Sequence, residues 1–133
     1  MNEVMIIGGG LAGCEAAWQL ARRGCGVKLF DMKPHKFSPA HESEQLGELV
    51  CSNSLRSADP HSAVGLLKEE MRSLDSLIIK TPDQTAVPPG RPHAVARQLF
   101  ARTNTATQPH KRLVTVDREE ITAMPENKNS ITN

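Results

Sequence analysis

Three glycines near the start of the chain have the spacing of a phosphate-binding turn. Gly8, Gly10 and Gly13 form the pattern G-x-G-x-x-G between an apolar run and a helical pattern. In such a turn the first glycine permits a tight bend, the second lets the backbone approach a pyrophosphate, and the third lets the helix pack closely. Unpaired N–H groups and the positive end of the helix dipole would face the phosphates. The residues expected to bind a dinucleotide here are Gly8, Gly9, Gly10, Leu11, Ala12 and Gly13.

A carboxylate follows at the distance that ribose binding requires. Asp31 lies 18 positions after Gly13, and about 20 are typical for the acid that accepts hydrogen bonds from ribose hydroxyls. The same carboxylate would repel a 2′-phosphate, which favours FAD or NAD over NADP. A glycine-rich turn without a ligand is the alternative, but the surrounding strand, helix and second strand favour binding.

A cysteine cluster at residues 49–56 is the second candidate for chemistry. Cys51 is followed by Ser52 and Asn53, and Arg56 is close in sequence. A thiol among hydroxyl and amide donors and near a guanidinium can lose its proton more easily, which makes it nucleophilic. From the residues alone, an inert, half-buried loop cysteine is the favoured interpretation.

A βαβ unit must position the glycines and the carboxylate. Residues 4–7 form a short apolar run, as in a strand covered on both faces of a parallel sheet. Residues 11–23 follow a helical pattern, and Gly24 is placed to end that helix in the left-handed conformation. Residues 27–30 predict a second strand that ends at Asp31. The sequence therefore predicts an α/β, Rossmann-like FAD-binding domain with a parallel sheet.

The next part of the chain predicts a loop, a helix and a short strand. Residues 32–57 read mostly as loop, because breakers such as Lys33-Pro34 interrupt them. Asp59 is expected to cap a helix that has Pro60 at its first position and ends near Leu74. The apolar run at residues 77–79 predicts a strand.

The C-terminal part has weaker signals. Residues 94–102 predict a weak helix, and residues 113–116 and 120–122 predict a hairpin or two short strands. The polar residues 127–133 are expected to form a disordered tail after a partial FAD-binding domain at residues 1–126.

Composition excludes several classes of protein. A chain of 133 residues has the length of one domain, and its net charge of +1 argues neither for nor against a nucleic-acid partner. Its three cysteines form no CxxC pair, which is typical of a reducing cytoplasm. The five histidines have no second ligand at metal spacing, so we expect no metal site. The N-terminal apolar run is too short for a signal peptide or a membrane span.

Four motifs match one family in order. They are the glycine turn with its helix at residues 8–21, Pro-Ala-His at 39–41, the cysteine motif at 48–56, and the Lys-Glu-Glu-Met helix at 63–71. On these motifs the chain resembles the N-terminal part of the folate- and FAD-dependent tRNA (uracil-5-)-methyltransferases. The resemblance is strong up to Lys80 and thinner beyond it.

The resemblance implies a defined reaction. Enzymes of this family transfer a one-carbon unit from methylenetetrahydrofolate to C5 of the T-loop uridine of tRNA. FAD, reduced by NAD(P)H, supplies the reducing equivalents. By the same resemblance, the glycines and Asp31 would hold FAD, Ser52 and Asn53 would lie near the flavin, and Cys51 would be a candidate catalytic thiol.

Family members are several times longer than this chain, so the resemblance covers a domain incomplete at its C-terminal end. Folate and tRNA contacts would lie beyond residue 133. Three interpretations stay open: an inactive gene fragment, an enzyme completed by a separately encoded C-terminal part, and a stand-alone FAD- or NAD-binding module.

Overall fold

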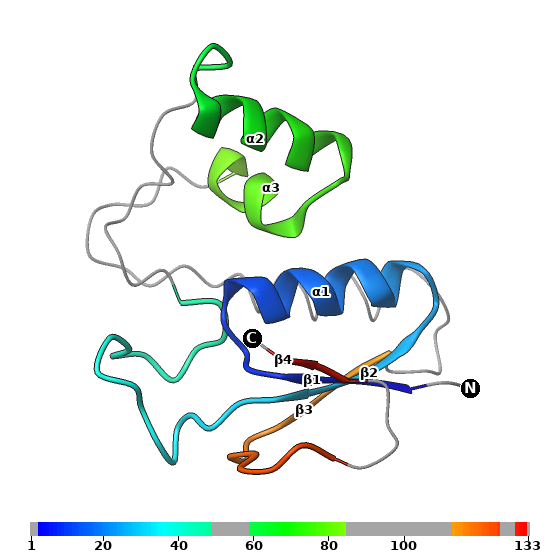
Figure 1. The fold of residues 1–133 in the computed structure, drawn as a ribbon, viewed down its shortest axis with the longest axis vertical. Coiled ribbons are helices and arrows are strands. Elements are labelled where there is room, and N and C mark those ends of the chain that lie inside the picture. Colours follow the sequence, from blue (N-terminus) through cyan, green and yellow to red (C-terminus); the bar gives the residue numbers. More distant parts are fainter. Residues whose placement is uncertain (1–2, 49–58, 85–112, 126–129, 133) are drawn as a thin grey trace.

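The protein forms a parallel sheet with its helices on one face (Figure 1). The computed structural model describes residues 3–48, 59–84, 113–125 and 130–132. The sheet order is β3-β2-β1-β4, and every neighbouring pair of strands is parallel. The strands are β1 (Glu3–Ile7), β2 (Gly26–Phe30), β3 (Val114–Asp117) and β4 (Ser130–Thr132). This arrangement confirms the α/β, Rossmann-like fold with a parallel sheet.

Helix α1 (Leu11–Arg22) connects β1 to β2 and covers the sheet (Figure 1). Its extent agrees with the predicted helix. It ends at Gly24, which has a φ of 78° and donates its N–H to the Ala21 carbonyl at 3.0 Å. A residue with a Cβ is strained in that conformation, so glycine is the natural choice at this helix end.

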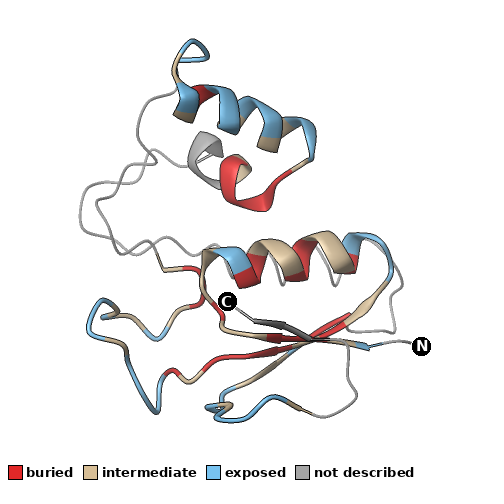
Figure 2. Ribbon diagram, in the orientation of Figure 1, coloured by how far each residue is buried: buried red, intermediate tan, exposed pale blue. Residues whose placement is uncertain are grey.

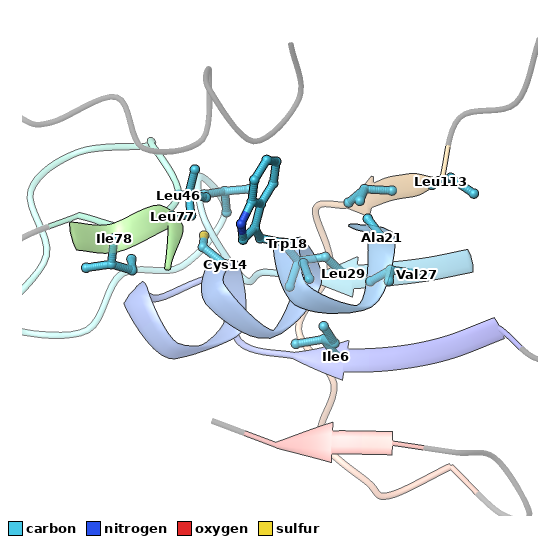
Figure 3. Close-up of a cluster of buried hydrophobic side chains, with 12 residues drawn as sticks. Ile6, Cys14, Trp18, Ala21, Val27, Leu29, Leu46, Leu77, Ile78 and Leu113 are labelled. Carbon is cyan, nitrogen blue, oxygen red and sulfur yellow. The ribbon is translucent and has the colours of Figure 1, made fainter. Parts of the chain in front are cut away.

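The core lies between α1 and the sheet, where Figure 2 shows the buried residues gathered. Ile6 of β1 is paired with Leu29 of β2, and both side chains are fully buried. Trp18 of α1 packs in the same cluster (Figure 3). Residues 4–7 of β1 form a continuous apolar run, whereas β2 is interrupted by Lys28, whose side chain is partly exposed.

Helix α2 (Ala63–Ser73) starts later than the sequence predicts. Its N-cap is Ser62, whose hydroxyl accepts the Gly65 N–H at 3.1 Å. Asp59, the predicted cap, instead accepts the His61 N–H at 2.9 Å within the preceding turn. The predicted start was therefore wrong by one turn, because the Asp59 side chain serves a local turn. The predicted end near Leu74 is confirmed.

The strand predicted at residues 77–79 is wrong, since these residues open helix α3 (Leu77–Gln84). Glu15 of α1 provides the reason. Its Oε2 accepts the Ser76 hydroxyl at 2.9 Å and the Ile78 N–H at 3.1 Å, so a carboxylate from another helix caps α3. Ile78 is buried toward α1 (Figure 3). Capping and burial together outweigh the strand preference of β-branched residues.

The C-terminal predictions had mixed outcomes. The strand predicted at residues 113–116 is confirmed as β3, but it pairs parallel to β2, so there is no hairpin. Residues 120–122 are not a strand. Ser130–Thr132 form β4 beside β1, so the expected disorder is wrong for these three residues. The weak helix predicted at residues 94–102 lies outside the described residues.

Candidate functional site

The turn between β1 and α1 requires glycine at two positions, Gly8 and Gly13. Gly8 has a φ of 103°, a left-handed value that disfavours other residues, and donates its N–H to the Phe30 carbonyl at 2.9 Å. A Cβ on Gly13 would lie 1.9 Å from the Gly8 carbonyl oxygen. The two glycines therefore let α1 start directly against the end of β1.

The N-terminus of α1 has backbone N–H groups that can bind an anion. Gly10 is the N-cap and makes no side-chain capping bond. The first turn of a helix leaves its N–H groups without intrahelical partners, and the helix dipole makes that end positive. The Cys14 N–H donates to the Gly10 carbonyl at 3.0 Å. A phosphate at this helix end would satisfy the donors that precede Cys14.

Asp31 is held against the glycine turn. Its Oδ2 accepts the Gly9 N–H at 2.9 Å, and its Oδ1 accepts the Lys33 N–H at 2.8 Å. The Arg118 guanidinium lies 4.0 Å from Oδ1. A Cβ on Gly9 would lie 2.5 Å from Oδ2, so Gly9 must also be glycine for this contact. The structure thus brings the predicted ribose acid and the predicted phosphate turn together.

A cavity of about 310 Å³ opens beside this contact. Gly8, Gly9, Gly10 and Asp31 line it, as the sequence predicts for a shared ligand site. Leu11, Ala12 and Gly13 belong to α1 and are not among its lining residues. The predicted Cys51, Ser52 and Asn53 lie outside the described residues.

Three further residues line the cavity, and the sequence singled out only His41 among them, as part of the Pro-Ala-His motif. His41, Glu119 and Glu120 line it, although they come from the loop after β2 and the segment after β3. Both segments follow the carboxyl ends of neighbouring parallel strands, which is where ligands bind in open α/β sheets. That rule could have singled out Glu119 and Glu120 once β3 was placed beside β2.

The loop at residues 43–48 is fastened to the glycine turn. The Gly47 N–H donates to the Gly9 carbonyl at 2.7 Å, and Leu46 is fully buried in the core. The Lys33 side chain is only 4% exposed, and its ammonium donates to the Gln45 carbonyl and lies 3.7 Å from the Glu48 carboxylate. The buried Lys33 ammonium therefore stabilises the position of this loop through Gln45 and Glu48.

Replacing Lys33 by methionine should loosen this loop. Lys33→Met removes a charged hydrogen bond and leaves the Glu48 carboxylate without its ammonium, so we expect a loss of about 2 kcal/mol in the free energy of unfolding. Urea denaturation followed by circular dichroism measures it. In the double variant Lys33→Met/Glu48→Gln the uncompensated charge is gone, so part of the stability should return. Equal losses in both variants would contradict the ion-pair contribution.

Cys14 is an unreactive thiol under the same turn. It is fully buried and its Sγ–H donates to the Gly9 carbonyl at 3.5 Å. Burial, with a further contribution from the Asp31 carboxylate, raises the pKa of the Cys14 thiol to about 12. The thiolate is the nucleophilic form, so this thiol stays protonated and inert at neutral and mildly alkaline pH.

We expect iodoacetamide at about pH 8 to leave Cys14 unmodified in the folded chain while it alkylates the half-buried Cys25. Peptide mass mapping distinguishes the two sites. In urea the burial is lost, and both should react. Alkylation of Cys14 as fast as Cys25 in the folded chain would show that the thiol is not protected.

Among residues 3–48, 59–84, 113–125 and 130–132, no group of three or more His, Cys, Asp or Glu side chains could hold a metal ion. No helix in these same ranges is long and apolar enough to span a membrane.

Comparisons with known proteins agree with the sequence motifs. The family model described as glucose inhibited division protein A matches residues 3–133. A curated relative from Desulfotalea psychrophila, named methylenetetrahydrofolate--tRNA-(uracil-5-)-methyltransferase TrmFO, is 60% identical over 126 residues, 95% of this chain and 28% of the relative. Relatives of the same name from Pelotomaculum thermopropionicum and Oleidesulfovibrio alaskensis are 56% identical over 125 residues and 54% identical over 124 residues. The match to the Pelotomaculum relative covers 94% of this chain and 29% of the relative. The match to the Oleidesulfovibrio relative covers 93% of this chain and 28% of the relative. The resemblance indicated by the motifs is confirmed, and the chain spans less than a third of the length of these relatives.

Proposed function

Because the chain belongs to the glucose inhibited division protein A family, we propose that it binds FAD in the cavity between the glycine turn and Asp31. The ADP half of FAD has a pyrophosphate and a ribose at the spacing that a βαβ unit recognises. The helix end at Gly10 would take the pyrophosphate, and Asp31 would accept hydrogen bonds from the ribose. We propose that residues 1–126 carry this partial domain, with β4 as an added strand.

The observation that carries the proposal is the hydrogen bond from the Gly9 N–H to Asp31 Oδ2 at 2.9 Å. It sets the acid at a fixed position relative to the phosphate-binding turn. A Cβ on Gly9 would collide with the Leu46 and Asp31 side chains, and a Cβ on Gly13 would collide with the Gly8 carbonyl oxygen. Glycine at both positions therefore keeps the acid and the helix close to the turn, as dinucleotide binding requires. These features fit a dinucleotide.

Charge around the cavity favours FAD over NADP. Asp31, Glu119 and Glu120 all line it, and the Glu120 carboxylate also pairs with the Lys36 ammonium. A 2′-phosphate placed among them would meet like charges, whereas ribose hydroxyls would meet hydrogen-bond acceptors. NAD carries the same ADP half as FAD, so it is the competing ligand.

We further propose that the chain supplies the FAD-binding part of a folate-dependent tRNA (uracil-5-)-methyltransferase of the cytoplasm. The names of the relatives support this activity, with methylenetetrahydrofolate as donor and tRNA as substrate. When bound, FAD supplies the reducing equivalents that turn a methylene unit into a methyl group, and NAD(P)H would restore them. Cys51, Ser52 and Asn53 remain our candidates for the flavin side of the site, with Cys51 as the catalytic thiol.

The test is reconstitution with the C-terminal portion of a relative. The chain is combined with the C-terminal portion of the Desulfotalea psychrophila relative, and transfer of labelled carbon from methylenetetrahydrofolate to tRNA is measured. We expect label in the uracil base with the wild-type chain and none with Gly10→Glu, whose side chain would occupy the pyrophosphate position. FAD binding without any transfer would instead favour a stand-alone module or an inactive fragment.

A further inference from the structure

His41 is a polar side chain of the cavity to which neither the family nor the relatives' names give a role. It is half-buried in the loop after β2 and lines the cavity together with the glycine turn and Asp31. His41 belongs to the Pro-Ala-His motif, but its spacing of ten positions from Asp31 does not predict this proximity. The fold brings it there because the loop turns back toward the glycine turn.

The imidazole ring is oriented by Ser38. His41 Nδ1 lies 2.6 Å from the Ser38 hydroxyl, and the His41 N–H donates to the Ser38 carbonyl at 3.1 Å. The Ala40 N–H donates to the same hydroxyl oxygen at 3.4 Å, and the hydroxyl hydrogen is free to donate to Nδ1. In the tautomer that this bond selects, the ring hydrogen is on Nε2. Within the described residues Nε2 has no hydrogen-bond partner.

The other polar side chains that line the cavity do not offer a hydrogen-bond donor to a ligand. Asp31, Glu119 and Glu120 are acceptors, and the ammonium of Lys33 is directed to the Gln45 carbonyl and Glu48. Arg118 donates to the Lys33 and Glu44 carbonyls and is not among the lining residues. Among the described lining residues, the His41 imidazole is thus the side chain that can donate a hydrogen bond to a ligand oxygen. The other available donors are backbone N–H groups.

We propose that His41 Nε2 donates a hydrogen bond to an oxygen of the ADP half of FAD, with Ser38 as the residue that positions the ring. This inference rests on the proposed FAD site and adds a binding residue to it. Asp31 accepts from the ligand and His41 donates to it, so the pair recognises an ADP group that presents both hydroxyl donors and oxygen acceptors.

Two variants of His41 separate binding through Nε2 from a structural role. A glutamine amide reaches the position of Nε2, whereas the shorter asparagine amide reaches only that of Nδ1. We expect His41→Asn to weaken FAD binding about tenfold, the scale of one hydrogen bond, and His41→Gln to stay close to wild type. Ser38→Ala should give a smaller loss. His35→Gln, an exposed histidine of the same loop that does not line the cavity, is the matched control and should bind normally.

The measurement is FAD titration of the 133-residue chain by flavin fluorescence, with ADP as a competitor and the melting temperature recorded without ligand. Equal weakening of FAD and ADP binding by His41→Asn, at an unchanged melting temperature, supports the proposal. Three results overturn it: wild-type affinity in His41→Asn, weakening for FAD without weakening for ADP, or equal losses in both variants with a lower melting temperature. A wild-type chain that binds no FAD contradicts the proposed function itself, and with it the role of His41.

Discussion

Replacing Gly13 by alanine is expected to abolish FAD binding and to destabilise the fold. The added Cβ would lie 1.9 Å from the Gly8 carbonyl oxygen and 3.1 Å from its carbon. Both are backbone atoms, which cannot rotate away as a side chain can. The helix must therefore shift away from β1. Overpacking of this kind lowers the free energy of unfolding by about 3 kcal/mol or more when the neighbouring atoms cannot move. The shift also moves the helix end that would hold the pyrophosphate.

Gly26→Ala is the matched control for this variant. A Cβ on Gly26 would meet its nearest atoms, on Glu3, at 3.9 Å, which is an ordinary contact. Thermal unfolding and FAD titration of both variants separate a general effect of glycine replacement from the collision at Gly13. A Gly13→Ala chain with wild-type stability and FAD affinity would contradict the close packing of the glycine turn.

Replacing Asp31 by asparagine should weaken FAD binding by about 10- to 100-fold. Asp31 accepts two backbone N–H groups, from Gly9 and Lys33, and would also accept from the ribose. An amide has one acceptor oxygen, so its NH₂ group would face a donor or the ligand hydroxyls. Hydrogen bonds to charged groups contribute about 1.5–3 kcal/mol, which corresponds to the expected range of affinity.

Asp117→Asn provides the comparison. Asp117 ends β3 as Asp31 follows β2, but its carboxylate pairs with Lys28 at 2.8 Å on the surface and does not line the cavity. We expect FAD affinity close to wild type in that variant. If Asp31→Asn and Asp117→Asn had the same affinity in fluorescence titrations, the assignment of Asp31 as the ribose acid would be wrong.

The N-terminal unit could be predicted because its signals are local. The apolar runs, the three glycines and Asp31 follow one another within about thirty residues, and each reflects a backbone requirement of the βαβ turn. Gly9 was named only as part of the turn, because its tight approach to Asp31 depends on the position of the Asp31 side chain and is not visible in spacing.

Other parts depend on contacts between distant residues. Residues 77–79 become helical because Glu15 caps α3 from another helix, which no local pattern shows. Lys33 sits before a proline and reads as a surface loop residue, yet its ammonium is buried under the loop that follows. His41 enters the cavity through a loop path that propensity does not predict.

Binding of FAD at the glycine turn is tested most directly by titration of the purified 133-residue chain with FAD, followed by flavin fluorescence. We expect saturable binding in the wild-type chain and none in Gly10→Glu, because the glutamate side chain would place bulk and negative charge where the pyrophosphate binds. Absence of binding in a soluble, folded wild-type chain, or equal binding in Gly10→Glu, would contradict the account.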